Sequence, residues 1–123
     1  MVNIQNGIIT MNRGDTFYMP LCINVGTKLE PTYYTITDKD EVFFALEEYN
    51  QPFEFALIRK KFTESDLVDG NVVIKLNSSD TEKLLPGNYY YEIKLRHVSL
   101  DENDLEQEFI DTIVPRRKFI ILE

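Results

Sequence analysis

The residues that could carry catalytic or metal chemistry are few and lie far apart in this sequence. His97 is the only histidine and Cys22 the only cysteine, so an internal disulfide is excluded. A zinc site or a nucleophile–histidine–acid triad needs several such residues in fixed roles, and the sequence marks no partner for His97. We therefore expect a structural His97, a Cys22 buried as a small hydrophobe, and no catalytic residue, cofactor or metal site.

Acidic side chains gather in the segment 99–107, which holds Asp101, Glu102, Asp104 and Glu106. Carboxylate oxygens are the ligands that Ca²⁺ prefers. The spacing does not fit an EF-hand loop, because no glycine follows and Leu105 occupies a ligand position. The pattern favours the solvated tip of a hairpin, and weak Ca²⁺ binding stays open as an alternative.

Aromatic side chains are the remaining candidates for recognition, since exposed rings can stack on sugars or anchor a protein interface. In the strand-like run 89–98, alternation predicts that Tyr89 and Tyr91 face the core and that Tyr90 faces outward. Phe43 points opposite to Phe44, so it either contacts a partner or packs beneath a flanking loop. The candidate partner-binding residues are Tyr18, Tyr33, Tyr34, Phe43 and Tyr90, with one of Tyr33 and Tyr34 expected to face outward.

The elements that must position these residues are predominantly strands. Runs of alternating apolar and polar residues, separated by turn signals, predict about eight strands in an all-β, antiparallel, immunoglobulin-like sandwich. At most one short helix is expected, over 79–85 with Ser79 and Glu82 as its capping box. Pro20 predicts an edge strand or a bulge, residues 115–117 a turn, and Tyr89, just after Pro86 and Gly87, a tyrosine corner.

Composition narrows the classes of function. The chain has 123 residues with 21 acidic and 13 basic side chains, for a net charge of −8. One domain over 1–123 is expected from this length, and the acidic balance disfavours nucleic-acid binding. The two short basic clusters, at 59–61 and 116–118, lie within or beside strand-like segments, which favours solvent-facing strand charge over a nucleic-acid patch. No signal peptide is visible and no apolar run approaches the length of a bilayer span, so we expect no membrane association.

Two segments carry a resemblance to a known family. They read MNRGDTFYMPLCI (residues 11–23) and DGNVVIKLNSSDTEKLLPGNYYYEIKL (residues 69–95), with DEVFFALEE and FALIRKKF between them. Their order resembles the N-terminal immunoglobulin-like domain of phage and prophage baseplate upper proteins. The matching positions are Gly14-Asp15-Thr16, Asp40-Glu41-Val42-Phe43-Phe44, Asp80-Thr81, Leu84, Gly87, Tyr89, Tyr91 and Ile93.

The resemblance covers most of the chain, and its motifs mark turns and core positions rather than a site. It implies a non-enzymatic virion structural protein of the baseplate, tail or head surface, made in the bacterial host cytoplasm. Its partners would be other virion proteins and further copies of itself in a homo-oligomer, without nucleic acid. The alternative from another class is a carbohydrate- or cell-surface-binding β-sandwich module, which the absence of tryptophan disfavours.

Overall fold

The computed structural model describes residues 3–5, 7–24, 26–27 and 29–123. Within them the chain forms ten strands, one short α-helix and two single-turn 3-10 helices. The elements are β1 (Asn3–Gln5), β2 (Ile8–Asn12), β3 (Phe17–Leu21), β4 (Ile23–Asn24), β5 (Tyr33–Tyr34), β6 (Asp40–Glu47), η1 (Phe53–Phe55), β7 (Ile58–Phe62), η2 (Glu64–Asp66), β8 (Val72–Leu76), α1 (Ser78–Thr81), β9 (Gly87–Leu100) and β10 (Glu106–Leu122).

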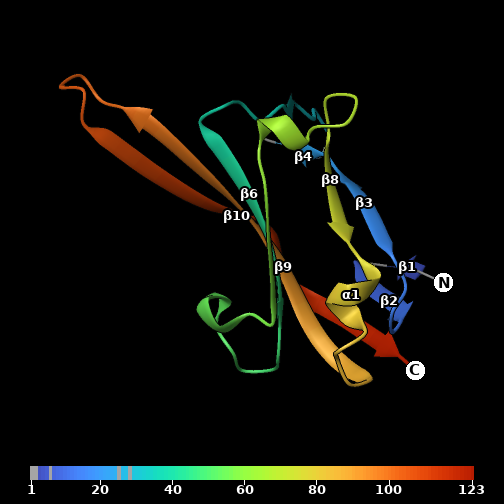
Figure 1. Cartoon of the computed structure of the whole chain (residues 1–123). Helices are drawn as coiled ribbons and strands as arrows, with labels where there is room; N and C mark the ends of the chain where they lie inside the picture. Colours follow the sequence, from blue (N-terminus) through green and yellow to red (C-terminus); the bar gives the residue numbers. More distant parts are fainter. Residues whose placement is uncertain (1–2, 6, 25, 28) are drawn as a thin grey trace.

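The main sheet has six strands in the order β1-β2-β10-β9-β6-β7 (Figure 1). Every neighbouring pair is antiparallel except β2 and β10, which run parallel from Phe119 opposite Ile9 to Leu122 opposite Asn12. An all-β fold is therefore confirmed, whereas the purely antiparallel arrangement is wrong. The physical reason is that a strand near the N-terminus lies beside the C-terminal strand, a pairing that short hairpin connections do not produce.

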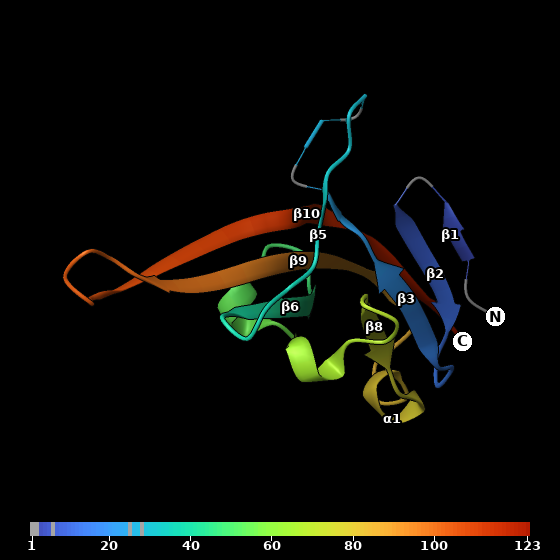
Figure 2. The same ribbon diagram turned by 90° about the horizontal axis from the view of Figure 1, so that it is seen from above.

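A second, two-stranded ribbon made of β3 and β8 lies over one face of the main sheet (Figure 2). The hydrophobic core fills the space between them, and the rings of Phe17 on β3 and Phe119 on β10 meet edge to face at 6.0 Å. A further small pair, β4 with β5, has its own short ladder. The core side chains are Ile9, Met11, Phe17, Ile23, Ile36, Val42, Phe44, Leu46, Ile58, Phe62, Val72, Ile74, Leu76, Tyr91, Ile93, Leu95, Phe119 and Ile121.

Alternation along β9 places its residues as the sequence predicts. Tyr91, Ile93 and Leu95 are buried and Tyr89 is half-buried on the same face. The Tyr89 hydroxyl donates to the backbone oxygen of Leu85 at 2.5 Å, so the predicted tyrosine corner is present. Among the described residues β3 pairs with β8 alone, so Pro20 lies on an edge strand, which is one of the two outcomes predicted for it.

Three local expectations differ from the structure. The helix spans Ser78–Thr81, and its cap is Asn77, whose N–H donates to Asp80 Oδ2 at 2.7 Å, rather than the Ser79 and Glu82 pair. Cys22 is exposed because it lies between β3 and β4, where the ladder is interrupted.

The turn expected at 115–117 lies instead inside β10, which is one 17-residue strand. Register shifts occur between Thr112 and Val114 and between Val114 and Arg117. These irregularities accommodate Pro115, because a bulge leaves a residue outside the hydrogen-bonded ladder. The last two strands expected from the sequence are therefore one continuous strand, β10, in the structure.

The hairpin of β9 and β10 extends well beyond the rest of the molecule (Figures 1 and 2). Strand β6 pairs with β9 only as far as His97, and beyond that point β9 and β10 are paired with each other. We call residues 98–110 the arm. Across the described part of the chain, none of the helices is long and apolar enough to span a membrane.

Candidate interaction surfaces

The face of the main sheet turned away from the β3–β8 ribbon carries two of the five predicted partner-binding residues. The register pairs Phe43 with Lys94 and Glu47 with Tyr90, and paired residues share a face. Phe43 and Tyr90 therefore lie on one side of the β6–β9 pair. We call this side the outer face.

Phe43 lies in a shallow hollow on the outer face. It is half-buried, and the ring of Phe53 from η1 meets it edge to face at 6.3 Å. The Arg59 guanidinium and the Lys94 ammonium lie 4.7 Å and 5.0 Å from the centre of the Phe53 ring. The flanking loop thus covers Phe43 in part, while a hollow of about 360 Å³ next to it remains open, with Ile110 among its lining residues.

Tyr90 belongs to a second cluster, nearer the start of β9. Its ring lies 5.9 Å from that of Tyr49, and the Arg116 guanidinium lies 5.1 Å above it. Arg116 is held there by Nη2, which donates to the backbone oxygen of Glu48 at 2.6 Å. Lys118 is the cross-strand neighbour of Tyr90 and is exposed. We call Tyr49, Tyr90, Arg116 and Lys118 the basic aromatic patch.

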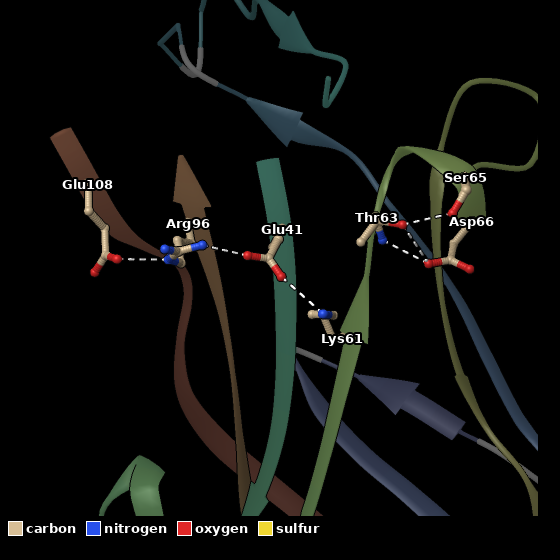
Figure 3. A network of polar contacts seen from close by, with 7 residues as sticks. All are labelled: Glu41, Lys61, Thr63, Ser65, Asp66, Arg96 and Glu108. Atoms are coloured by element: carbon tan, nitrogen blue, oxygen red, sulfur yellow. Dashed lines mark hydrogen bonds and ion pairs between the residues drawn. The ribbon is translucent and has the colours of Figure 1, made fainter. Parts of the chain in front are cut away.

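An ion-pair network crosses four strands at the root of the arm (Figure 3). Arg96 on β9 donates from Nε to Glu108 Oε2 at 2.8 Å and from Nη1 to Glu41 Oε1 at 2.6 Å. Lys61 on β7 lies 3.3 Å from the other Glu41 oxygen. Burial alone would raise the pKa of Glu41, but these two cations hold it below its ordinary value. The network ties the arm to the sheet.

Figure 3 also shows the turn that follows β7. The Thr63 N–H donates to Asp66 Oδ2 at 2.8 Å, and the Thr63 hydroxyl lies 2.8 Å from that of Ser65. Thr63 is therefore the cap of η2. These contacts are local and close the turn between β7 and β8.

Glu47 is a buried carboxyl group on the outer face, and sequence reasoning missed it. Neither of its oxygens has a hydrogen-bond partner among the described residues, and its side chain has no exposure. Burial raises the pKa of Glu47 to about 7, and the neighbouring Glu92 carboxylate adds to this effect. The positive charges of Arg116 and Lys94 oppose it without cancelling it.

A Tyr34–Asp40–His97 cluster lies on the opposite, core-facing side of the arm root. Asp40 is buried, and its carboxylate accepts from the Tyr34 hydroxyl and from the Thr37 N–H at 2.8 Å. His97 Nδ1 lies 2.5 Å from Asp40 Oδ1. Burial raises the pKa of Tyr34, and the carboxylate raises it further. This partner of His97 could not be predicted, because the order of residues does not show which residues are opposite one another on neighbouring strands.

The chemistry open to this cluster is limited by its surroundings. A hollow of about 350 Å³ beside it is lined by side chains that include no serine, threonine or cysteine. The Thr37 hydroxyl donates to Asp40 Oδ2 at 3.2 Å and is therefore a further donor to this carboxylate. Through its hydrogen bonds, Asp40 acts as a staple: it links the turn before β6 to strand β9.

The other three predicted residues lie elsewhere. Tyr18 is 58% exposed on β3, on the side away from the buried Phe17, with the Lys75 ammonium 5.4 Å from its ring. Tyr33 is 67% exposed on β5, whereas Tyr34 turns inward to Asp40. Tyr18 thus faces away from the outer face, and the five predicted residues do not form one surface.

The acidic tip of the arm is organised by its own backbone. Asp101 Oδ1 accepts from the N–H groups of Asn103 and Leu105 at 2.8 Å and 2.9 Å. Over the residues with described positions, no three histidine, cysteine, aspartate or glutamate side chains are grouped to hold a metal ion. The carboxylates of Glu102, Asp104 and Glu106 point into solvent as exposed groups.

The arm also exposes four large apolar side chains that sequence reasoning did not single out. They are 52–63% exposed: Leu100, Leu105, Phe109 and Ile110. Their signal in the sequence is weak, since strand alternation alone cannot show that a hairpin leaves the body of the protein.

Comparisons of the chain with family models, with curated proteins and with solved structures found no match.

Proposed function

We propose that this chain is a non-enzymatic structural protein of a phage virion that assembles through protein–protein contacts. The resemblance of residues 11–23 and 69–95 to baseplate upper proteins supports the virion setting. Its partners are further copies of the chain and other proteins of the baseplate, tail or head surface. The hydrogen-bonded staple role of Asp40 and His97 is consistent with a protein without catalysis.

The proposal includes an immunoglobulin-like sandwich as the fold. In such a sandwich two strands equivalent to β3 and β8 lie in one sheet, and three equivalent to β6, β9 and β10 lie in the other. The strand order here and the tyrosine corner at Tyr89 support this assignment. The second sheet has only two strands among the described residues, which is narrower than the usual form.

One observation carries the assembly role: an arm that leaves the body and exposes Leu100, Leu105, Phe109 and Ile110. Burying apolar surface is favourable by about 25 cal/mol per Å², so a projecting element with four such side chains gains by meeting a partner. Exposed apolar surface marks interaction sites in soluble proteins, and here it lies on both sides of the arm, because Phe109 and Ile110 are neighbours in one strand. A catalytic or structural role within one copy would not require these side chains outside the core.

The solution mass of the purified chain over a concentration series tests the proposal. Light scattering is expected to show a discrete multimer whose population rises with concentration. A chain that stays monomeric throughout, and that binds glycans on an array, would contradict the proposal and favour the carbohydrate-binding alternative. Tyr18 and Tyr90 face opposite sides of the molecule, so their two rings cannot form one surface on which a sugar stacks.

A further inference from the structure

The two ends of the β9–β10 hairpin differ in charge and in the kind of apolar group they expose. The arm presents Leu100 and Leu105 together with exposed carboxylates. These carboxylates are those of Glu102, Asp104 and Glu106, and none of them forms an ion pair with a described side chain. The basic aromatic patch, at the other end, presents two tyrosine rings and two cations.

The patch has the complementary chemistry. Arg116 is bonded to a backbone oxygen rather than to a carboxylate, and Lys118 is exposed beside Tyr90. Tyr49 is 69% exposed, so its ring is open to an apolar partner. Aromatic rings next to arginine are the side chains that most often anchor protein interfaces. The arm, with its leucines and surrounding carboxylates, is therefore complementary to the basic aromatic patch both in apolar surface and in charge.

The two surfaces cannot meet within one copy. Tyr90 and Leu100 lie on the same continuous strand, and ten residues at about 3.3 Å each separate them by roughly 33 Å. The network of Arg96 with Glu41 and Glu108 holds the arm to the sheet and directs it away from the body (Figures 1 and 3). The arm of one copy can reach only the patch of another.

We propose that the arm of one copy docks on the basic aromatic patch of the next, in a head-to-tail contact. Leu100 and Leu105 cover the rings of Tyr49 and Tyr90, and the arm carboxylates face Arg116 and Lys118. This inference rests on the proposed assembly function and names its contact. Because the two surfaces are different, two copies joined by one contact still carry a free arm and a free patch. Further copies can therefore add through the same contact, into a ring or a filament.

Charge reversal in two separate variants tests the contact. The arm-reversed variant carries Glu102→Lys, Asp104→Lys and Glu106→Lys, and the patch-reversed variant carries Arg116→Glu and Lys118→Glu. Each alone sets like charges against each other, so sedimentation velocity is expected to show monomers at a concentration where the wild-type chain is multimeric. An equimolar mixture is expected to regain the multimer, because each kind of contact is again oppositely charged.

Controls use equal charge changes on exposed residues away from both surfaces. Lys75→Glu with Lys83→Glu matches the patch variant, and Glu30→Lys, Glu64→Lys and Glu123→Lys matches the arm variant. Both controls are expected to keep the wild-type mass, and circular dichroism verifies that every variant is folded.

Each other outcome contradicts the contact in a distinguishable way. A multimer that withstands both reversals overturns the arm–patch contact and leaves assembly as the function. Single reversals that abolish the multimer, followed by a mixture that does not restore it, overturn the complementarity. A wild-type chain that is monomeric at every concentration overturns both this contact and homo-assembly.

Discussion

A single hydroxyl group closes the corner that precedes β9. The Tyr89 side chain enters the strand half-buried and bonds back to the carbonyl of Leu85, across the Pro86–Gly87 turn. This contact satisfies a backbone acceptor that the turn would otherwise leave without a partner. It also fixes the direction in which the long hairpin starts.

Tyr89→Phe is expected to lower the free energy of unfolding by about 1 kcal/mol, the usual net value of one neutral hydrogen bond. Urea denaturation followed by fluorescence or circular dichroism measures the change. Tyr33→Phe is the matched control, because this exposed ring on β5 loses the same atom at little cost. An equal loss in both variants would assign the effect to the hydroxyl in general rather than to the corner.

Glu47 makes stability depend on pH near neutrality. Its pKa is about 7 in the folded chain against an ordinary value of 4.5, so the folded state holds the proton more tightly. Its contribution is fully present below about pH 4.5 and is lost as the pH rises through about 7. The free energy of unfolding therefore falls over this window, by up to about 3 kcal/mol.

Glu47→Gln cannot ionise, so the variant is expected to lose most of this decline between about pH 5 and about pH 8. Chemical denaturation at a series of pH values gives the two slopes. Glu48→Gln, an exposed neighbour with the same change in charge, is expected to keep the wild-type slope. Parallel curves for wild type and Glu47→Gln would show that the buried carboxyl does not titrate in this range.

For single residues, the sequence predicts the environment correctly where it depends only on alternation within one strand. The alternation of β6 and β9 is enough to place Phe43 and Tyr90 on the outer face. It is silent on cross-strand neighbours such as Asp40 and His97, because their contact depends on register. The burial of Glu47 has no signal in the local sequence, because its neighbours, such as Glu92 and Arg116, come from other strands.

Among the elements, the arm stands out because it contributes little to the core. None of its described residues belongs to the hydrophobic core, and after the bond from the Val98 N–H to the Lys39 oxygen its two strands are paired with each other. Its free energy of folding therefore depends on the body, whereas the body does not depend on the arm.

Replacing residues 99–107 by Asn-Gly, which favours a two-residue hairpin turn between the paired residues Val98 and Glu108, tests this independence. Thermal unfolding is expected to occur within a few degrees of the wild-type chain, because the Arg96–Glu108 ion pair and the core are retained. The multimer, in contrast, is expected to disappear in light scattering. A shortened chain that no longer folds would show that the arm is part of the folding unit.

Elements were predictable where turn chemistry and alternation agree, and not where a bulge intervenes. The runs that became β6, β8 and β9 are read directly from their period of two. Pro115 indicates a turn, because proline lacks the donor that a ladder needs, yet one register shift before it and a second that spans it carry β10 past this point. The parallel pairing of β2 with β10 was missed because it joins segments about a hundred residues apart in sequence.

For the whole molecule, the proposed assembly joins surfaces of opposite charge on a chain whose net charge is −8. Salt screens the attraction between arm and patch, but it also screens the general repulsion between copies. The close contacts of a docked arm are expected to dominate.

The weight-average mass is therefore expected to fall as sodium chloride rises from about 0.05 M to about 0.5 M. Sedimentation velocity at fixed protein concentration measures it. A mass that rises with salt would show that apolar burial holds the copies together and that charge only keeps them apart.

The unbroken course of β10 has a mechanical consequence. This strand runs from the tip of the arm to the ladder with β2, while β9 runs back along it and into the ladder with β6. A pull along the arm is thus directed along strands whose inter-strand hydrogen bonds lie across the load. Many such bonds are loaded together in shear instead of opening one at a time. The hairpin, which is paired within the middle of the sheet, is therefore expected to resist force along its length.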